Sequence, residues 1–198
     1  MDSTTATLIA AIVVMVIFSA YFSATETAFS SLNKIRLRSK AEAGDTRAAL
    51  TLSIADEYDR MLSTILIGNN IVNITASTLG TVLFTRLFNA YGPTISTVVL
   101  TVVVLIFGEI SPKSIAKESP ERIAMWASPL LRVLLVILRP LNFVFSQWKR
   151  LLSHIIRPAD GEGITEDELI TMVSEAESEG GLDQHESQLI RSAIEFGD

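Results

Sequence analysis

The sequence predicts an all-α membrane protein with three transmembrane helices, a juxtamembrane helical segment and a small cytoplasmic helical hairpin. Three observations predict this fold class. The mean hydropathy of the 198 residues is +0.40, uncharged runs of more than 20 residues recur, and the charge is unevenly divided. Residues 1–159 have a net charge of +5 and residues 160–198 one of −11, so the chain consists of two different parts.

Uncharged stretches cover residues 3–25, 61–85 and 87–108. Each is long enough to cross a bilayer core, which needs about 20 apolar residues in a helix. The loop between the first two spans holds six basic residues, whereas the loop between the second and third has only Arg86 at its edge. Because cytoplasmic loops are enriched in Lys and Arg, we expect a plasma-membrane protein whose N-terminus is outside and whose C-terminal region is cytoplasmic.

A fourth apolar region, residues 123–148, is interrupted by Arg132 and by Pro140. A charge at mid-bilayer is costly and a proline kinks a helix, so a straight fourth crossing is disfavoured. Trp126 and Trp148 are typical anchors of a helix at the membrane surface. We therefore expect an interfacial or half-inserted helical hairpin after the third span.

The acidic tail has the sequence signals of a soluble helical hairpin. Residues 158–163 have the composition of a linker, and Thr165 opens a helix with a capping box. Two glycines follow this helix, and Asp183 can cap a second one. We expect a transmembrane domain over residues 1–157 and an acidic helical bundle over residues 164–198.

The composition excludes several classes of protein. Without cysteine, the chain can form no disulfide scaffold and no Cys-ligated metal centre. Its basic residues are scattered between apolar runs and its tail would repel phosphate, so nucleic acid is not an expected partner. The sequence has no Ser-His-Asp set, His-Glu-x-x-His motif or phosphate-binding loop, and we therefore do not expect an enzyme.

Each predicted span contains a cluster of polar residues, and such residues need partners inside a membrane. In the first span, hydroxyl side chains recur every three or four residues and so share one helix face beside Glu26. They are Ser19, Ser23, Thr27 and Ser30. The second span places three amides within five residues, at Asn69, Asn70 and Asn73. The structural alternatives for these two clusters are hydrogen bonds to the helix backbone and an amide zipper between helices.

The third cluster is the sequence Gly108-Glu-Ile-Ser-Pro-Lys113. Pro112 has no amide hydrogen and kinks the helix, so the carbonyl of Gly108 loses its helical partner beside the Glu109 carboxylate. The structural alternative is an ion pair between Glu109 and Lys113. All donors in the three clusters are oxygens, which favours a hard cation, namely magnesium, calcium, sodium or potassium.

With these motifs, the sequence resembles the CorC/CNNM family of magnesium transporters. The resemblance rests on residues 22–31, 67–73 and 108–113, in that order, and covers residues 1 to about 150. It implies a homodimer in the lipid bilayer, with three membrane helices and a juxtamembrane belt in each subunit. It also implies that magnesium leaves the cytoplasm in exchange for sodium. From its charge, the acidic bundle is a candidate contact with the partner subunit when cations screen it.

Members of this family continue beyond the bundle into a pair of CBS modules that bind adenine nucleotide. Here residues 195–198 stop abruptly after a predicted helix. We therefore expect the protein to be cut short ahead of a CBS pair, and we assign nucleotide binding to no residue of this chain.

The resemblance implies that a dehydrated magnesium ion is held by six residues from the three spans. They are Ser23, Thr27, Asn70, Asn73, Gly108 and Glu109. Glu26 is a candidate site for the coupling ion, and Pro112 marks the helix kink. An alternative function is that of a regulatory or scaffolding membrane protein that binds magnesium but does not conduct it.

Overall fold

The computed structural model describes residues 2–143, 147, 166–178 and 181–195. All regular secondary structure in these residues is helical. The chain divides into two compact units, residues 1–147 and residues 148–198.

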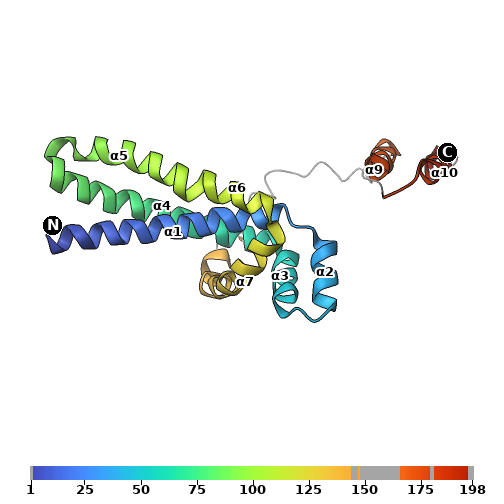
Figure 1. The fold of residues 1–198 in the computed structure, drawn as a ribbon, viewed down its shortest axis with the longest axis horizontal. Coiled ribbons are helices and arrows are strands. Elements are labelled where there is room, and N and C mark those ends of the chain that lie inside the picture. Colours follow the sequence, from blue (N-terminus) through green and yellow to red (C-terminus); the bar gives the residue numbers. More distant parts are fainter. Residues whose placement is uncertain (1, 144–146, 148–165, 179–180, 196–198) are drawn as a thin grey trace. The chain divides into compact units, whose positions relative to one another are not determined.

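Three long helical segments lie side by side in the first unit (Figure 1). They are α1 (Ser3–Ser30), α4 (Tyr58–Phe88) and an uninterrupted run of α5 (Gly92–Val103), η2 (Val104–Ile110) and α6 (Ser111–Glu118). By length and composition, the helical stretches Ser3–Ser30 and Tyr58–Glu118 could each cross a membrane.

The second apolar stretch folds back on itself. Its 61 residues would measure about 90 Å as one straight helix, about three times the thickness of a bilayer core. The chain instead reverses at η1 (Asn89–Tyr91), where Asn89 adopts a φ of 50°. The consequence is that α5 returns along α4 (Figure 1).

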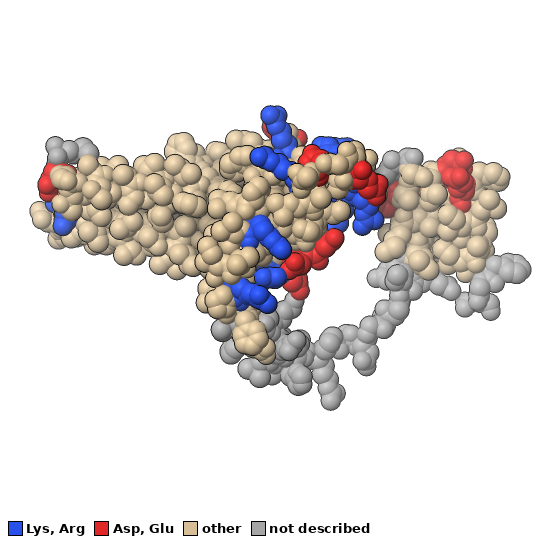
Figure 2. Space-filling model, turned by 90° about the horizontal axis from the view of Figure 1, so that it is seen from below, with Lys and Arg blue, Asp and Glu red and all other residues tan. Residues whose placement is uncertain are grey.

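The long helices pack closely where their side chains are small. The ring of Phe22 on α1 lies directly against Gly68 of α4, so that any side chain at position 68 would overlap this ring. Towards the other end of these helices, a second apolar cluster joins Ile12, Leu83 and Leu100. On the face shown in Figure 2, the long helices present a surface largely without Lys, Arg, Asp or Glu, and the charged residues gather towards its ends.

Short helices cover one end of the long ones. They are α2 (Lys34–Glu42), α3 (Thr46–Asp56) and α7 (Pro120–Ile137). Asn33 and Asp45 begin α2 and α3 by accepting hydrogen bonds from free backbone N–H groups, as good N-cap residues do. The main core lies where α1, α3, α4 and α7 meet. It includes Phe22, Ile54, Met61, Ile65 and Leu131.

Helix α7 crosses the long helices and is seen nearly end-on in Figure 1. Its buried side faces the core through Leu131 and Leu135. Its other side exposes apolar residues, with Trp126 62% exposed and Val133 52% exposed. The helix ends at Ile137, and residues 139–143 are helical again. Residues 144–146 and 148 lie outside the described residues, so the interfacial hairpin stays a prediction.

The second unit contains α9 (Glu166–Ser178) and α10 (Gln184–Glu195). Asp183 caps α10 as expected, because its Oδ1 accepts hydrogen bonds from the backbone N–H groups of His185 and Glu186 at 2.7 and 2.8 Å. The Glu186 side chain accepts in return from the Asp183 N–H at 3.0 Å, which completes a capping box. The predicted linker, Thr165 and the predicted boundary between residues 157 and 164 lie outside the described residues.

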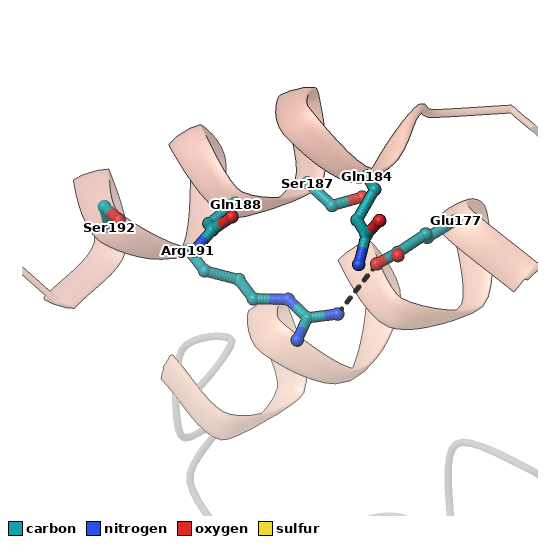
Figure 3. A pocket seen from close by; sticks show the side chains of 6 residues that line it. All are labelled: Glu177, Gln184, Ser187, Gln188, Arg191 and Ser192. Atoms are coloured by element: carbon teal, nitrogen blue, oxygen red, sulfur yellow. Dashed lines mark hydrogen bonds and ion pairs between the residues drawn. The ribbon is translucent and has the colours of Figure 1, made fainter.

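An ionic contact joins the two helices of this unit. The Arg191 guanidinium on α10 donates to Glu177 Oε2 at 3.0 Å and to Ser174 Oγ at 3.1 Å on α9. Figure 3 shows the polar pocket beside this contact. Its lining consists of Glu177, Gln184, Ser187, Gln188, Arg191 and Ser192.

Candidate cation site between three helices

Helix α1 contributes two buried hydroxyl groups to its contact with α4 and η2. Ser19 and Ser23 are each only 1% exposed, and they lie one turn apart on the same face. Ser19 Oγ donates to Asn69 Oδ1 of α4 at 3.3 Å. Ser23 Oγ is buried without a hydrogen-bond partner in the part of the chain that the structure describes. Nearby Thr25 does bond its own backbone, at 2.6 Å from Tyr21 O, so Ser23 differs from an ordinary hydroxyl in a membrane helix.

The remaining hydroxyls of this face are more accessible. Thr27 is half-buried one turn beyond Ser23, and Ser30 is exposed. The helix face with hydroxyl groups that the sequence predicted is therefore buried at Ser19 and Ser23 and becomes accessible towards the C-terminal end of α1.

The three amides of α4 have different surroundings. Asn69 Oδ1 accepts from Ser19 Oγ, and also from Asn73 Nδ2 at 3.5 Å. Asn73 Oδ1 is buried and has no hydrogen-bond partner among the described residues. Asn70 is exposed, and its Nδ2 donates to the backbone carbonyl of Leu66 at 2.8 Å. The structure thus links Asn69 and Asn73 to α1 and leaves Asn70 outside this network.

The third helix reaches the network through a π-helix, which the sequence reasoning did not predict. In η2 the backbone N–H of Ser111 donates to Ile106 O, five residues earlier. Gly108 lies within this π-helix and is buried against α1, since a methyl group at position 108 would stand 2.9 Å from Ser19 Oγ. Such widened turns are often found at functional sites. Pro112 was the available signal, because its ring cannot fit the regular α-helical pattern.

Within the described residues 2–143, the structure does not contain the ion pair between Glu109 and Lys113 that was the structural alternative for the third cluster. Lys113 Nζ lies 3.3 Å from Glu26 Oε2, which ties α6 to α1. Glu109 is half-buried, and its carboxylate has no ion-pair partner in the described part of the chain. Pro112 lies in the first turn of α6.

The chemistry of the site is that of oxygen donors with little charge. Among the described residues, no group of three or more His, Cys, Asp or Glu side chains comes together. The junction of α1, α4 and η2 instead offers hydroxyl and amide oxygens, and the carboxylate of Glu109 belongs to the residue next to Gly108 in η2. Hard cations prefer such ligands, whereas zinc and copper prefer imidazole and thiolate.

Comparison with known proteins agrees with the membrane character of the first unit. The family model described as "Cyclin M transmembrane N-terminal domain" (CNNM) matches residues 9–186. A UPF0053 protein of Haemophilus influenzae is 37% identical over 187 residues, which cover 93% of this chain and 44% of that protein. The UPF0053 inner membrane protein YfjD of Escherichia coli is 39% identical over 165 residues, covering 81% of this chain and 39% of that protein.

A more distant relative has a functional name. The polyamine export protein of Haemophilus influenzae is 25% identical over 203 residues, which cover 95% of this chain and 47% of that protein. The chain thus spans less than half the length of these three relatives. With the family model matched over most of its residues, the chain is a membrane protein that belongs to the CNNM (cyclin M) transmembrane domain family.

Proposed function

We propose that this protein is a magnesium transporter that moves Mg²⁺ out of the cytoplasm in exchange for sodium. The observation that supports it most is a pair of buried oxygens without hydrogen-bond partners on facing helices, Ser23 Oγ on α1 and Asn73 Oδ1 on α4. A buried polar atom without a partner is costly, and more so where no water is available. Among the described residues no hydrogen bond satisfies either oxygen, so each is available as a ligand to a cation bound between the helices.

The proposed ligands come from all three long segments. They are Ser23, Thr27, Asn70, Asn73, Gly108 and Glu109. Mg²⁺ requires near-octahedral geometry with oxygens at about 2.1 Å and sheds its water reluctantly. Six converging oxygens are the minimum for a dehydrated ion, and a single carboxylate among neutral oxygens would allow the ion to be released again.

Asn70 would bind the ion through its amide oxygen. In the structure it is exposed and donates to Leu66 O. This hydrogen bond uses only the NH₂ end of the amide, so Oδ1 remains an acceptor, and we assign its contact with the ion to the occupied state of the site.

The proposal includes the arrangement in the membrane. The three long segments each cross the bilayer, with the N-terminus outside, while α2, α3 and α7 form a belt at the cytoplasmic surface. Two such subunits form a homodimer, and the acidic unit contacts the partner subunit. Trp126 and the apolar side of α7 are suited to the membrane surface, where amphipathic helices lie in the plane of the bilayer.

The proposed transport step uses the irregular part of the third helix. The turns of η2 can tighten or widen by one hydrogen bond, which moves Gly108 relative to Ser19. An ion pair joins Glu26, near the C-terminal end of α1, to Lys113 of α6. Its opening would free Glu26 for sodium. Adenine nucleotide would act through CBS modules and not through residues of this chain.

Transport by purified protein in liposomes tests this proposal. With a Mg²⁺ indicator inside the vesicles, we expect Mg²⁺ flux that depends on an opposed sodium gradient and disappears in Glu109→Ala. Glu118→Ala removes an exposed acidic residue of α6 and serves as the matched control with unchanged flux.

Two other outcomes would contradict the proposal. If the wild-type protein binds Mg²⁺ but moves none, it is a magnesium-binding regulatory or scaffolding protein. A polyamine is the other possible cargo, because one relative is named for polyamine export. Flux of labelled spermidine without flux of Mg²⁺ would therefore show that the transported cation is a polyamine and not magnesium.

A further inference from the structure

Three polar side chains form a connected chain of hydrogen bonds beside the proposed cation site. Ser19 Oγ and Asn73 Nδ2 both donate to Asn69 Oδ1, at 3.3 and 3.5 Å. A carbonyl oxygen has two lone pairs, and both are used here. The carbonyl oxygen of Asn69 therefore binds its two neighbouring side chains and has little capacity left to bind a cation.

The hydrogen bond from Asn73 to Asn69 decides which end of the Asn73 amide points away from Asn69. The oxygen and nitrogen ends of an amide have nearly the same shape, so the hydrogen-bond partner sets the orientation. Asn69 Oδ1 attracts the NH₂ group of Asn73 and would repel its oxygen. Asn73 Oδ1 therefore points to the other side, where it is buried without a partner in the described part of the chain.

Gly108 allows η2 to lie close to these hydrogen-bonded side chains. A methyl group at position 108 would stand 2.9 Å from Ser19 Oγ, closer than a carbon and an oxygen normally approach. Ser19 itself is only 1% exposed, so its hydroxyl has little room to choose another partner. The contact of η2 with Ser19 thus helps to keep the hydroxyl on Asn69.

We infer that Asn69 is a positioning residue, whose carbonyl oxygen, held by Ser19, keeps the Asn73 amide turned so that its oxygen faces the cation. This inference rests on the proposed function, because it assumes that Mg²⁺ binds at Asn73. An amide turned the other way would present the positive hydrogens of its NH₂ group to the ion. Removing the acceptor at Asn69 frees the amide to turn and weakens Mg²⁺ binding.

Calorimetric titration of the purified 198-residue protein with MgCl₂ tests this role. Asn69→Leu removes the acceptor and keeps the number and branching of the side-chain heavy atoms, and its effect is measured with the native Asn73 and again in the Asn73→Asp background. A carboxylate has two equivalent oxygens and needs no partner to orient it. Loss of a supporting partner typically lowers metal affinity by about 10-fold to 100-fold, and we expect such a loss with the native Asn73. In the Asn73→Asp background we expect a change of less than about 2-fold, the usual range for independent sites.

Equal losses in the two backgrounds would overturn the inference, because Asn69 would then act by packing or as a ligand. An unchanged affinity in Asn69→Leu, beside a clear loss in Asn73→Ala, would also overturn it while leaving the proposed site in place. Unchanged affinity in Asn73→Ala would overturn both the proposed site and the inference.

Two further variants serve as controls. Thr75→Val removes a hydroxyl of α4 that bonds its own backbone at Ile71 O, and it should leave the affinity unchanged in both backgrounds. Ser19→Ala removes one of the two donors to Asn69 and should weaken Mg²⁺ binding in the same direction, with no additional loss when combined with Asn69→Leu. If Asn69→Leu does not fold, Ser19→Ala allows the same comparison between the two Asn73 backgrounds.

Discussion

Two groups of buried polar side chains each include one residue of the same stretch of α1, Tyr21 or Ser23, and they differ in how many of their polar atoms have hydrogen-bond partners. Towards α7, the Tyr21 hydroxyl donates to Ala127 O at 2.9 Å, and Thr51 Oγ1 lies 2.7 Å from Ser128 Oγ between α3 and α7. Towards α4 and η2, Ser23 Oγ and Asn73 Oδ1 have no hydrogen-bond partner among the described residues.

This difference indicates separate roles for the two clusters. Hydrogen bonds that are complete within the protein stabilise the fold, because the cost of burying each polar group is already met. Buried oxygens that lack a partner mark a place where a ligand can supply one. Substitutions in the first cluster should therefore change stability, and substitutions in the second should change cation binding.

The largest expected effect is at Glu109. Glu109→Ala removes the single carboxylate of the proposed site and should lower Mg²⁺ affinity by at least the roughly 100-fold that marks the upper range for supporting partners. The increase in thermal unfolding temperature on adding Mg²⁺ should disappear, while the metal-free protein keeps its unfolding temperature. Glu118→Ala should behave like the wild-type protein in the same assay, and a full magnesium effect in Glu109→Ala would place the ion elsewhere.

The neutral ligands should show a graded effect. Asn73→Ala should weaken Mg²⁺ binding strongly, since it removes a buried oxygen of α4. Ser23→Ala should weaken it less, by about 10-fold, because water can take the place of a neutral hydroxyl. Titration with MgCl₂ measures the affinity of both variants. Equal affinities would contradict the expected difference between the ligand on α1 and the ligand on α4.

The structural cluster should respond in the opposite way. Tyr21→Phe removes the hydrogen bond to Ala127 O and should lower the free energy of unfolding by about 1 kcal/mol. Its Mg²⁺ affinity should stay that of the wild-type protein. Thermal unfolding with and without MgCl₂ measures both quantities, and a loss of affinity would show that the two clusters are coupled.

A smaller effect is expected for the ion pair between α1 and α6. Glu26 and Lys113 are partly exposed, with side chains 28% and 43% accessible, so their pairing should contribute less than about 1 kcal/mol. A double-mutant cycle with Glu26→Gln and Lys113→Gln measures this coupling. Sodium dependence of transport in Glu26→Gln then shows whether Glu26 has a role beyond the ion pair.

The long helices of the first unit could be predicted because their signals are local, whereas α2 and α3 were not predicted. Uncharged runs of 22 to 25 residues located the long helices. In the second unit, Asp183 was recognisable as a cap from its place before an amphipathic segment. The π-helix could not be located from such signals, because Pro112 only indicates that the regular pattern is interrupted. The way in which the chain absorbs this interruption depends on the packing of Gly108 against Ser19.

The choice between Asn69 and Asn70 also depends on packing. Neighbouring residues of an α-helix point about 100° apart, so either amide could have faced α1 by spacing alone. The structure turns Asn69 towards Ser19 and leaves Asn70 exposed. Whether Asn70 binds the ion stays a prediction, since its side chain is exposed in the structure.

The position of a bound ion tests the central claim most directly. A crystal structure of the protein grown with manganese in place of magnesium would locate the ion by its anomalous scattering. The account predicts a peak between α1, α4 and η2, in contact with Ser23, Asn73 and Glu109. A peak only at the acidic residues of the second unit, or no peak between the three helices at saturating manganese, would contradict it.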